Sequence, residues 1–347
     1  MHFIMNLLSR MLPLKYYERL VWSVKFVVYR NFRQNCIRKE ICGKENCDKN
    51  FYVLRNDNYH YGILSAYLDF LCEVEWAINR GYIPIVDLKN YYLPSLQNSD
   101  KKNKENAWDY YFTQPQSQYS LEEIYRSKNV ILGWKNGSFP YKKAWMAKPM
   151  TESEVEHWHY FSRKYFDFSD NIKERANVLW NEKVPKDSKV LGICIRASFY
   201  RGELLGQQKY LGHPKQAGLR ERIEQTRMKM KNWDCEFVFV SVDDREWLEE
   251  FKQYFGEKCI YVDRPLFHLF VDGAPVSSED QQQVGLQEFN EISVQQRTED
   301  YLTEIYSLTL CNSLFHTMTS GGTLAQIYKG NGYDNCEVDF KGQLKFE

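Results

Sequence analysis

The residues with the clearest chemical potential follow an apolar run at positions 190–195. Arg196 comes directly after this run, and Glu203 and His213 follow within a polar stretch that we predict to be a loop closing at Pro214. The apolar run has the composition of a buried strand. A cation and a carboxylate held on one loop at the end of such a strand suit a reaction that expels an anionic leaving group.

Two further predicted strands end in residues that suit the same chemistry. These residues are Asp243, Asp244, Thr319, Ser320, Gly321 and Gly322. Ligands of open parallel sheets bind outside the carboxyl ends of the strands, so the three strand ends could meet at one ligand. The guanidinium of Arg196 would hold a diphosphate by two hydrogen bonds, and the glycine turn would bring backbone amides to it at a helix N-terminus. The pattern therefore favours a nucleotide-sugar site.

Some of these residues also have an ordinary structural interpretation. Arg196 could form a buried salt bridge with an acid instead of contacting a ligand. Asp244 stands directly before a predicted helix that starts near Arg245, a position where aspartate commonly caps a helix. Both acids stay in the candidate binding set. Between them, we expect Asp244 to cap the helix and Asp243 to contact a ribose or a guanine.

Glu203 is the candidate general base, because a carboxylate on the loop after Arg196 lies within reach of the reactive end of a bound nucleotide. The alternative is that Glu203 is a solvated loop acid. His213 is a second candidate for the base, or else a phosphate contact. No His, Cys, Asp or Glu spacing is typical of a metal site, so the sequence predicts neither a metal nor a cofactor. Arg196 and the backbone amides would neutralise the leaving phosphate.

Alternating strands and helices must position these residues. In the first half we expect strands at 50–54, 83–87 and 129–133 and helices at 63–80, 120–127 and 153–181. In the second half we expect strands at 189–195, 235–242, 259–262 and 313–318 and helices at 214–231, 245–255, 298–311 and 323–328. Such alternation predicts an α/β protein with parallel sheets, and the strand–helix–strand segment of the first half predicts a Rossmann-like unit.

The chain of 347 residues is long enough for two domains of this class. We place a hinge at 185–188, an acceptor-side domain at 46–185 and a nucleotide-sugar-binding domain at 186–347. The first segment, 1–45, mixes Lys and Arg with apolar residues at helical spacing. Two interpretations of it stay open, a basic amphipathic helix on an anionic membrane surface and an ordinary helix packed on the domain.

Composition narrows the function classes. The formal net charge is zero, so nothing in the overall charge favours nucleic acid as a partner. Aromatic residues make up 16% of the chain, and we expect the cluster at 108–111 to lie against a glycan or glycolipid acceptor. The apolar runs are too short to span a bilayer, and a cytoplasmic location, peripheral on the inner face of the membrane, is expected. Five cysteines in apolar runs are predicted to be buried free thiols: Cys72, Cys194, Cys235, Cys259 and Cys311.

These residues resemble the GDP-fucose-dependent fucosyltransferase superfamily, which spans α-1,6-fucosyltransferases, nodulation fucosyltransferases and protein O-fucosyltransferases. The resemblance covers roughly residues 186–330. Its elements are the strand end Cys194-Ile195-Arg196, the loop with Glu203 and Gly212-His213-Pro214, the strand 238–244, and the run 301–322 with Glu304, Leu308 and Thr319-Ser320. Tyr61-Gly62 is a fainter echo in the first half. Cys194 stands where the family has a histidine, and residues 206–209 are additional.

The resemblance implies a GT-B-like fold of two facing Rossmann-like domains. It also implies metal-independent, inverting transfer with GDP-fucose as the donor. Within it, Tyr61 and Gly62 join the nucleotide-sugar-binding set. The first half resembles, more loosely, bacterial enzymes of surface-polysaccharide clusters.

We therefore expect an inverting glycosyltransferase that transfers fucose to a glycan in surface polysaccharide synthesis. Three alternatives remain open at this point. The first is a non-catalytic nucleotide-sugar-binding or membrane-docked scaffold protein, and the second is a glycosyltransferase with a different nucleotide sugar. The third is another α/β transferase or hydrolase, although the sequence has no Gly-x-Ser-x-Gly, Walker or Gly-x-Gly-x-x-Gly motif to support it.

Overall fold

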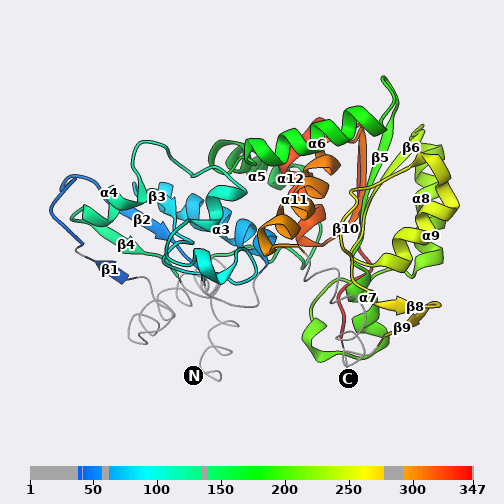
Figure 1. Cartoon of the computed structure of the whole chain (residues 1–347), viewed down its shortest axis with the longest axis horizontal. Coiled ribbons are helices and arrows are strands. Elements are labelled where there is room, and N and C mark those ends of the chain that lie inside the picture. Colours follow the sequence, from blue (N-terminus) through cyan, green and yellow to red (C-terminus); the bar gives the residue numbers. More distant parts are fainter. Residues whose placement is uncertain (1–37, 41, 57–61, 135–138, 277–291, 346–347) are drawn as a thin grey trace, which may run out of the picture.

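The computed structural model describes residues 38–40, 42–56, 62–134, 139–276 and 292–345. Most of the predicted basic segment and Tyr61 lie outside these residues. The described chain forms two separate, mainly parallel sheets, one in each half, with helices between and around them (Figure 1). The predicted α/β class with two parallel-sheet halves, the arrangement expected of a GT-B-like fold, is confirmed.

The first sheet has the strand order β1-β4-β2-β3. Its strands are β1 Arg38–Glu40, β2 Phe51–Leu54, β3 Ile83–Val86 and β4 Val130–Leu132. The central strand β2 runs parallel to both neighbours, while β1 pairs antiparallel with β4 at the edge. All four residues of β2 are buried, which explains why the sequence reads there as an unbroken apolar run.

Helix α3, Ile63–Ile78, connects β2 to β3 and completes the predicted strand–helix–strand unit. Its apolar positions at three- and four-residue steps, including Leu64, Leu68 and Leu71, are buried. The short helix α4, Leu121–Arg126, starts at the capping box that the sequence predicts from Ser120 and Glu123. α3 packs on the first sheet and also contacts the second half of the chain.

The second sheet has five parallel strands in the order β11-β10-β5-β6-β7. The strands are β5 Val190–Cys194, β6 Phe237–Ser241, β7 Cys259–Ile260, β10 Ser313–Thr317 and β11 Asn335–Asp339. The predicted four are confirmed, and β11 is an edge strand that the sequence analysis missed. Three of its five residues are Asn, Glu and Asp, and none of the five is buried, so β11 lacks the apolar pattern that reveals the other four.

Helices cover both faces of this sheet. α8 Leu219–Asn232 and α9 Arg245–Phe255 pack on the outer face, and α11 Val294–Leu310 and α12 Ser320–Lys329 lie on the side of the first half (Figure 1). Successive residues of a strand point to opposite faces of the sheet. In β5, Ile193 packs with the outer helices and Cys194 with the inner ones.

The predicted helical region at 153–181 is two helices, α5 Glu152–Tyr165 and α6 Asp170–Lys183. The chain leaves the helical path at Phe166, whose φ of −139° ends α5. α6 packs along α11, and Arg175 of α6 forms an ion pair with Asp300 of α11. α5 packs on α12 and α3. Together, α5 and α6 therefore join the halves into one continuous apolar core.

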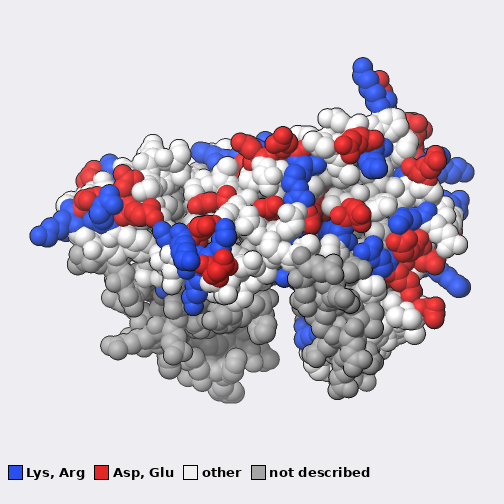
Figure 2. Space-filling view, in the orientation of Figure 1, with Lys and Arg blue, Asp and Glu red and all other residues white. Residues whose placement is uncertain are grey.

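The remaining regular elements are short. They are α7 Ala197–Leu204, the hairpin β8 Phe270–Val271 and β9 Ala274–Pro275, and the 3-10 turns Ser99–Lys101, Ala107–Tyr110, Gln208–Tyr210, Gly256–Lys258 and Gly330–Gly332. In the part of the chain that the structure describes, no helix combines the length and apolarity of a bilayer span. Where side chains are coloured in Figure 2, basic and acidic groups are interspersed, in keeping with a net charge of zero.

Burial settles two other predictions. The five cysteines expected in apolar runs are buried thiols. The aromatic cluster expected to face an acceptor is mostly interior instead, because Trp108 and Tyr111 have no exposed surface. Trp108 packs against Phe112 and Phe166 with ring centroids 4.8 Å apart in both cases. The cluster is part of the core of the first half, and its predicted role as a sugar-binding surface is wrong for these two rings.

Candidate active site

A cavity of about 300 Å³ lies between the two halves, at the carboxyl ends of the central strands. Six predicted binding residues line it: Gly62, Arg196, His213, Thr319, Ser320 and Gly321. Ile63, Leu64, Ser65, Met146, Phe199 and Tyr301 complete the lining. The structure therefore brings together residues from strand ends that are far apart in the sequence, as expected for a ligand site of parallel sheets.

Two helix N-termini meet at this cavity. α3 starts after Gly62, which offers no side-chain cap, and α12 starts after Thr319. The hydroxyls of Ser65 and Ser320, in the first turns of the two helices, lie 3.4 Å apart. Within the described residues, the amides of Ser320 and Gly321 donate no hydrogen bond. Two sets of partly positive helix ends thus face one space, an arrangement that favours an anion.

Arg196 follows β5 directly and occupies the cap position of α7. Its Nε lies 3.2 Å from a carboxylate oxygen of Asp243 and donates a 3.2 Å hydrogen bond to the hydroxyl of Ser198. The two terminal nitrogens of the guanidinium make no hydrogen bond to any described residue, and the side chain is 37% exposed. The predicted ion pair with an acid is present, and it anchors one edge of the guanidinium while the other edge is open to the cavity, so a ligand contact stays a prediction.

Asp243 is 5% exposed, just beyond the end of β6. Apart from the ion pair with Arg196, its carboxylate oxygens accept no hydrogen bond from the described part of the chain. A buried acceptor without a donor costs about 1–3 kcal/mol. A ligand that brings N–H or O–H groups next to Arg196 would remove that cost.

Asp244 has a different role from its neighbour. Its two carboxylate oxygens accept hydrogen bonds from the amides of Trp247 at 2.9 Å and Leu269 at 2.7 Å, and it has no exposed surface. Burial raises the pKa of Asp244 to about 7. The capping interpretation is confirmed. Its place in the predicted nucleotide-binding set is corrected, because both carboxylate oxygens already accept hydrogen bonds from backbone amides.

The polar stretch after Arg196 is helical instead of the predicted loop. α7 buries Ala197, Arg201 and Gly202, and a Cβ at Gly202 would come within 2.0 Å of the Tyr210 ring. Its residues contain no β-branched side chain or proline, so a helix is locally allowed, and the contact of Tyr210 with Gly202 helps to hold it. The polar composition alone had predicted a loop.

Glu203, the predicted base, lies in the last turn of α7 and lines neither this cavity nor the one next to it. Its carboxylate faces Lys215, with the two charged atoms 3.8 Å apart. The helix explains this position. On a flexible loop, Arg196 and Glu203 could approach the same ligand, but two residues seven positions apart in a helix are held about 10 Å apart along its axis. Within the described residues, the structure does not bring Glu203 to Arg196.

His213 does reach the cavity. Its ring packs edge-on against Phe199, with centroids 4.7 Å apart, and against Tyr210 at 5.8 Å. Its Nδ1 is buried and has no hydrogen-bond partner among the described residues. The backbone oxygen of His213 accepts a 2.8 Å hydrogen bond from Leu344, so the C-terminal tail fixes this segment in place.

The two glycines after Ser320 are helical residues, because α12 begins three residues earlier than predicted. A Cβ at Gly321 would lie 2.8 Å from Ile305, and one at Gly322 would lie 2.4 Å from the His316 ring. The amide of Gly322 donates to the hydroxyl of Thr319. Gly322 therefore lets the helix start pack closely on its neighbours, and it is not among the cavity residues.

Several lining residues were not predicted. Ser65 and Ile63 had a usable signal, because the start of the helix after the first strand of a Rossmann-like unit is a common anion site. Tyr301 fell inside a predicted helix, and Met146 lies in a stretch with no periodic pattern. Within the described ranges, no three His, Cys, Asp or Glu side chains are grouped so that they could hold a metal ion.

The overall fold is similar to solved fucosyltransferase structures. POFUT1 in complex with GDP-fucose matches with 10% identity and a TM-score of 0.45, over 86% of this chain and 100% of that chain. Fucosyltransferase NodZ from Bradyrhizobium matches with 12% identity and a TM-score of 0.40, over 80% and 92%. FUT1 from Arabidopsis thaliana matches with 11% identity and a TM-score of 0.45, over 83% and 70%.

No protein-family model matches the sequence, and no curated protein matches it either. These structural likenesses have TM-scores below 0.5, so they indicate neither the substrate nor the activity of this chain.

Proposed function

We propose that the chain is a glycosyltransferase that uses a nucleotide diphosphate sugar as its donor. The observation that carries this proposal is the convergence of the open edge of Arg196 with the N-termini of α3 and α12 on one cavity. A diphosphate offers the planar pairs of oxygens and the negative charge that such a site binds. We call this space the donor cavity.

The same groups would assist the reaction. When the bond between the anomeric carbon and the phosphate breaks, negative charge develops on the diphosphate. Arg196, Ser320 and Gly321 all line the cavity, so the guanidinium and the amides at the start of α12 would stabilise that charge. This arrangement supports transfer without a metal ion, and attack from the opposite side would invert the anomeric configuration.

GDP-fucose is the donor that we favour, on the basis of the sequence resemblance and of Asp243. Asp243 does not itself line the donor cavity, but the ion pair holds it beside Arg196, which does, and its unmet carboxylate oxygens suit the neighbouring N–H groups of guanine. The glycan acceptor, the link to surface polysaccharide, the cytoplasmic location and the membrane role of segment 1–45 remain predictions.

A non-catalytic nucleotide-sugar-binding protein is the second candidate. The position of Glu203 favours it, because the predicted base does not line the donor cavity. This candidate would bind GDP-fucose without cleaving it to GDP.

A thermal-shift panel followed by a turnover assay tests the proposal. GDP and GDP-fucose should raise the melting temperature more than GMP, UDP, dTDP and their sugars, because both the diphosphate and guanine are recognised. Incubation with GDP-fucose and a glycan mixture should then release GDP. If no nucleoside diphosphate raises the melting temperature, the proposed function is wrong. Binding without GDP release would favour the non-catalytic candidate.

A further inference from the structure

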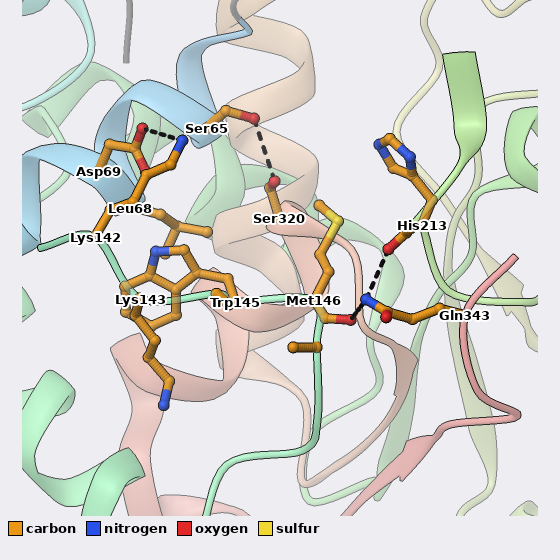
Figure 3. Close-up of a pocket in the computed structure, with 13 residues that line it drawn as sticks. Ser65, Leu68, Asp69, Lys142, Lys143, Trp145, Met146, His213, Ser320 and Gln343 are labelled. Atoms are coloured by element: carbon orange, nitrogen blue, oxygen red, sulfur yellow. Dashed lines mark hydrogen bonds and ion pairs between the residues drawn. The ribbon is translucent and has the colours of Figure 1, made fainter. Parts of the chain in front are cut away.

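A second cavity of about 370 Å³ adjoins the donor cavity (Figure 3). The two share Ser65, Met146, His213 and Ser320, so one opens beside the other along the start of α3. The second cavity extends from these shared residues toward the segment 142–147 of the first half and toward Gln343 of the C-terminal tail. A molecule in it would lie next to the reactive end of a bound nucleotide sugar.

The charges around this cavity are balanced. Asp69 is 5% exposed, and one of its carboxylate oxygens lies 3.4 Å from the ammonium of Lys142 (Figure 3). The neighbouring Lys143 forms an ion pair with Glu154. Because each charge has a counter-charge, the cavity has no net demand for a charged ligand, and a neutral one fits it best.

The rest of the lining combines apolar and hydrogen-bonding groups. Leu68, Trp145 and Met146 supply apolar surface, and the hydroxyls of Ser65 and Ser320 stand at the junction with the donor cavity. Trp145 is held by an edge-on contact with Trp158, with ring centroids 5.0 Å apart. Pyranosides have apolar C–H faces rimmed by hydroxyls, so this mixture matches their chemistry.

Ser65 and Asp69 lie one turn apart on the same face of α3, separated by about 6 Å along its axis. The first turn contacts the start of α12 through Ser320, at the donor cavity. The second turn places Asp69 in the adjoining cavity. α3 thus brings a carboxylate close to the junction where an acceptor hydroxyl would meet the anomeric carbon of the donor.

We propose that the second cavity is the acceptor site, that it takes a neutral pyranoside, and that Asp69 is the general base. This inference rests on the proposed function. Asp69 removes the proton of the acceptor hydroxyl as the hydroxyl oxygen bonds to the anomeric carbon. The bond from that carbon to the phosphate oxygen breaks, and its electron pair leaves with the diphosphate. The proton then passes from Asp69 to solvent. The ammonium of Lys142 lies 3.4 Å from a carboxylate oxygen of Asp69.

Acceptor binding is tested by saturation-transfer NMR with a panel of methyl pyranosides in the presence of GDP. At least one pyranoside should show signals with the wild-type protein. Ala147, which lines the second cavity and is exposed, can be replaced without disturbing the core. Ala147→Trp should fill the cavity and abolish the signals. If no pyranoside binds to the wild type, or if binding persists in Ala147→Trp, the acceptor assignment is wrong.

The base is tested with the pyranoside that binds. Asp69→Asn should lower acceptor-dependent GDP release from GDP-fucose by at least about 100-fold, the usual range for loss of a general base. Glu203→Gln is the competing carboxyl-to-amide variant, and Glu224→Gln, at an exposed surface pair, is the control. A large loss in Glu203→Gln with full activity in Asp69→Asn would overturn the assignment.

Calorimetric titration of each variant with GDP separates the two proposals. Asp69→Asn should bind GDP with an affinity within about twofold of wild type, which also shows that the variant is folded. If the wild type itself does not bind GDP, the proposed function fails. If GDP binds normally but pyranosides do not, only the acceptor inference fails.

Discussion

Asp243 and Asp244 are neighbours at the end of one strand, but their carboxylates meet different partners. The oxygens of Asp244 accept two backbone hydrogen bonds, whereas those of Asp243 have only the ion pair with Arg196 among the described residues. Burial alone does not distinguish them, since both are buried. Asp244 is therefore a structural residue, and Asp243 is the one that we propose to contact the nucleotide.

Substitution of the two acids should therefore give opposite results. Asp244→Ala should lower the free energy of unfolding by about 2–4 kcal/mol, because it removes a helix cap and leaves two buried amides without an acceptor. Asp243→Asn should change that free energy by less than about 1 kcal/mol but weaken GDP binding at least about tenfold, a loss of about 1.4 kcal/mol. Urea unfolding and GDP titration of both variants measure this. Equal effects of the two substitutions on GDP binding by folded protein would refute the division.

His316 gives a pH prediction. It belongs to β10, its ring is buried against the start of α12, and burial lowers its pKa to about 4. The unfolded chain has an ordinary histidine pKa near 6.5, so between these values the proton binds preferentially to the unfolded state. The free energy of unfolding should therefore rise with pH from about 4 to 6.5, by up to about 3 kcal/mol from this residue.

Urea unfolding at a series of pH values, with His316→Gln for comparison, checks the prediction. Asp244, whose pKa is raised to about 7, acts in the opposite direction, because its ionisation disfavours the folded state as pH rises from about 4 to 7. That contribution is present in both proteins, so their difference isolates His316. Parallel curves for wild type and His316→Gln would show that the buried ring does not titrate as described.

Among the elements, α12 depends most on close packing at its start. A Cβ at Gly322 would lie 2.4 Å from Nδ1 of His316, which is less than any normal contact. Gly322→Ala should therefore lower the free energy of unfolding by about 1–3 kcal/mol. Gly62→Ala is a matched control at the start of α3, where the backbone φ is −81° and no heavy atom lies within 4 Å of the added methyl group. Equal stability of the two variants in urea unfolding would contradict the packing argument.

The elements also show what the sequence can predict. The buried strands and α9 were found at nearly their observed bounds, because continuous apolar runs and a clear cap mark them. α7 was missed because its polar composition suggested a loop. The helix packs against residues outside its own segment, such as Tyr210 against Gly202, and the pattern of the segment itself does not show these contacts. β11 was missed because an edge strand needs few apolar residues.

The residues of the candidate site were likewise predicted only in part. Arg196, His213 and the start of α12 were predicted because strand ends in parallel sheets mark the ligand edge. Glu203 was assigned to the site because loop residues near in sequence were expected to stay near in space, and α7 separates them. Asp69 and Trp145 had no local signal. Their position depends on how the first half packs against the second.

For the whole molecule, the apolar core is continuous across the predicted domain boundary. Trp158 of α5 and Ile172 of α6 belong to the same core as Leu302 of α11 and Leu324 of α12. The ion pair between Arg175 and Asp300 crosses the same contact. The two halves are therefore expected to unfold together.

Differential scanning calorimetry tests this cooperativity. A single transition should be seen, with a calorimetric enthalpy equal to the van't Hoff enthalpy. Two resolved transitions would mean that the sheets unfold separately and that α5 and α6 do not join the halves in the way described.

The most direct test of the central claim is calorimetric titration of GDP into the wild type and into Arg196→Ala. The open edge of Arg196 should contribute about 2 kcal/mol or more to binding, so the variant should bind GDP at least about thirtyfold more weakly. Arg227→Ala, at an exposed surface ion pair, should bind like the wild type. Equal affinities of wild type and Arg196→Ala for GDP would contradict the account.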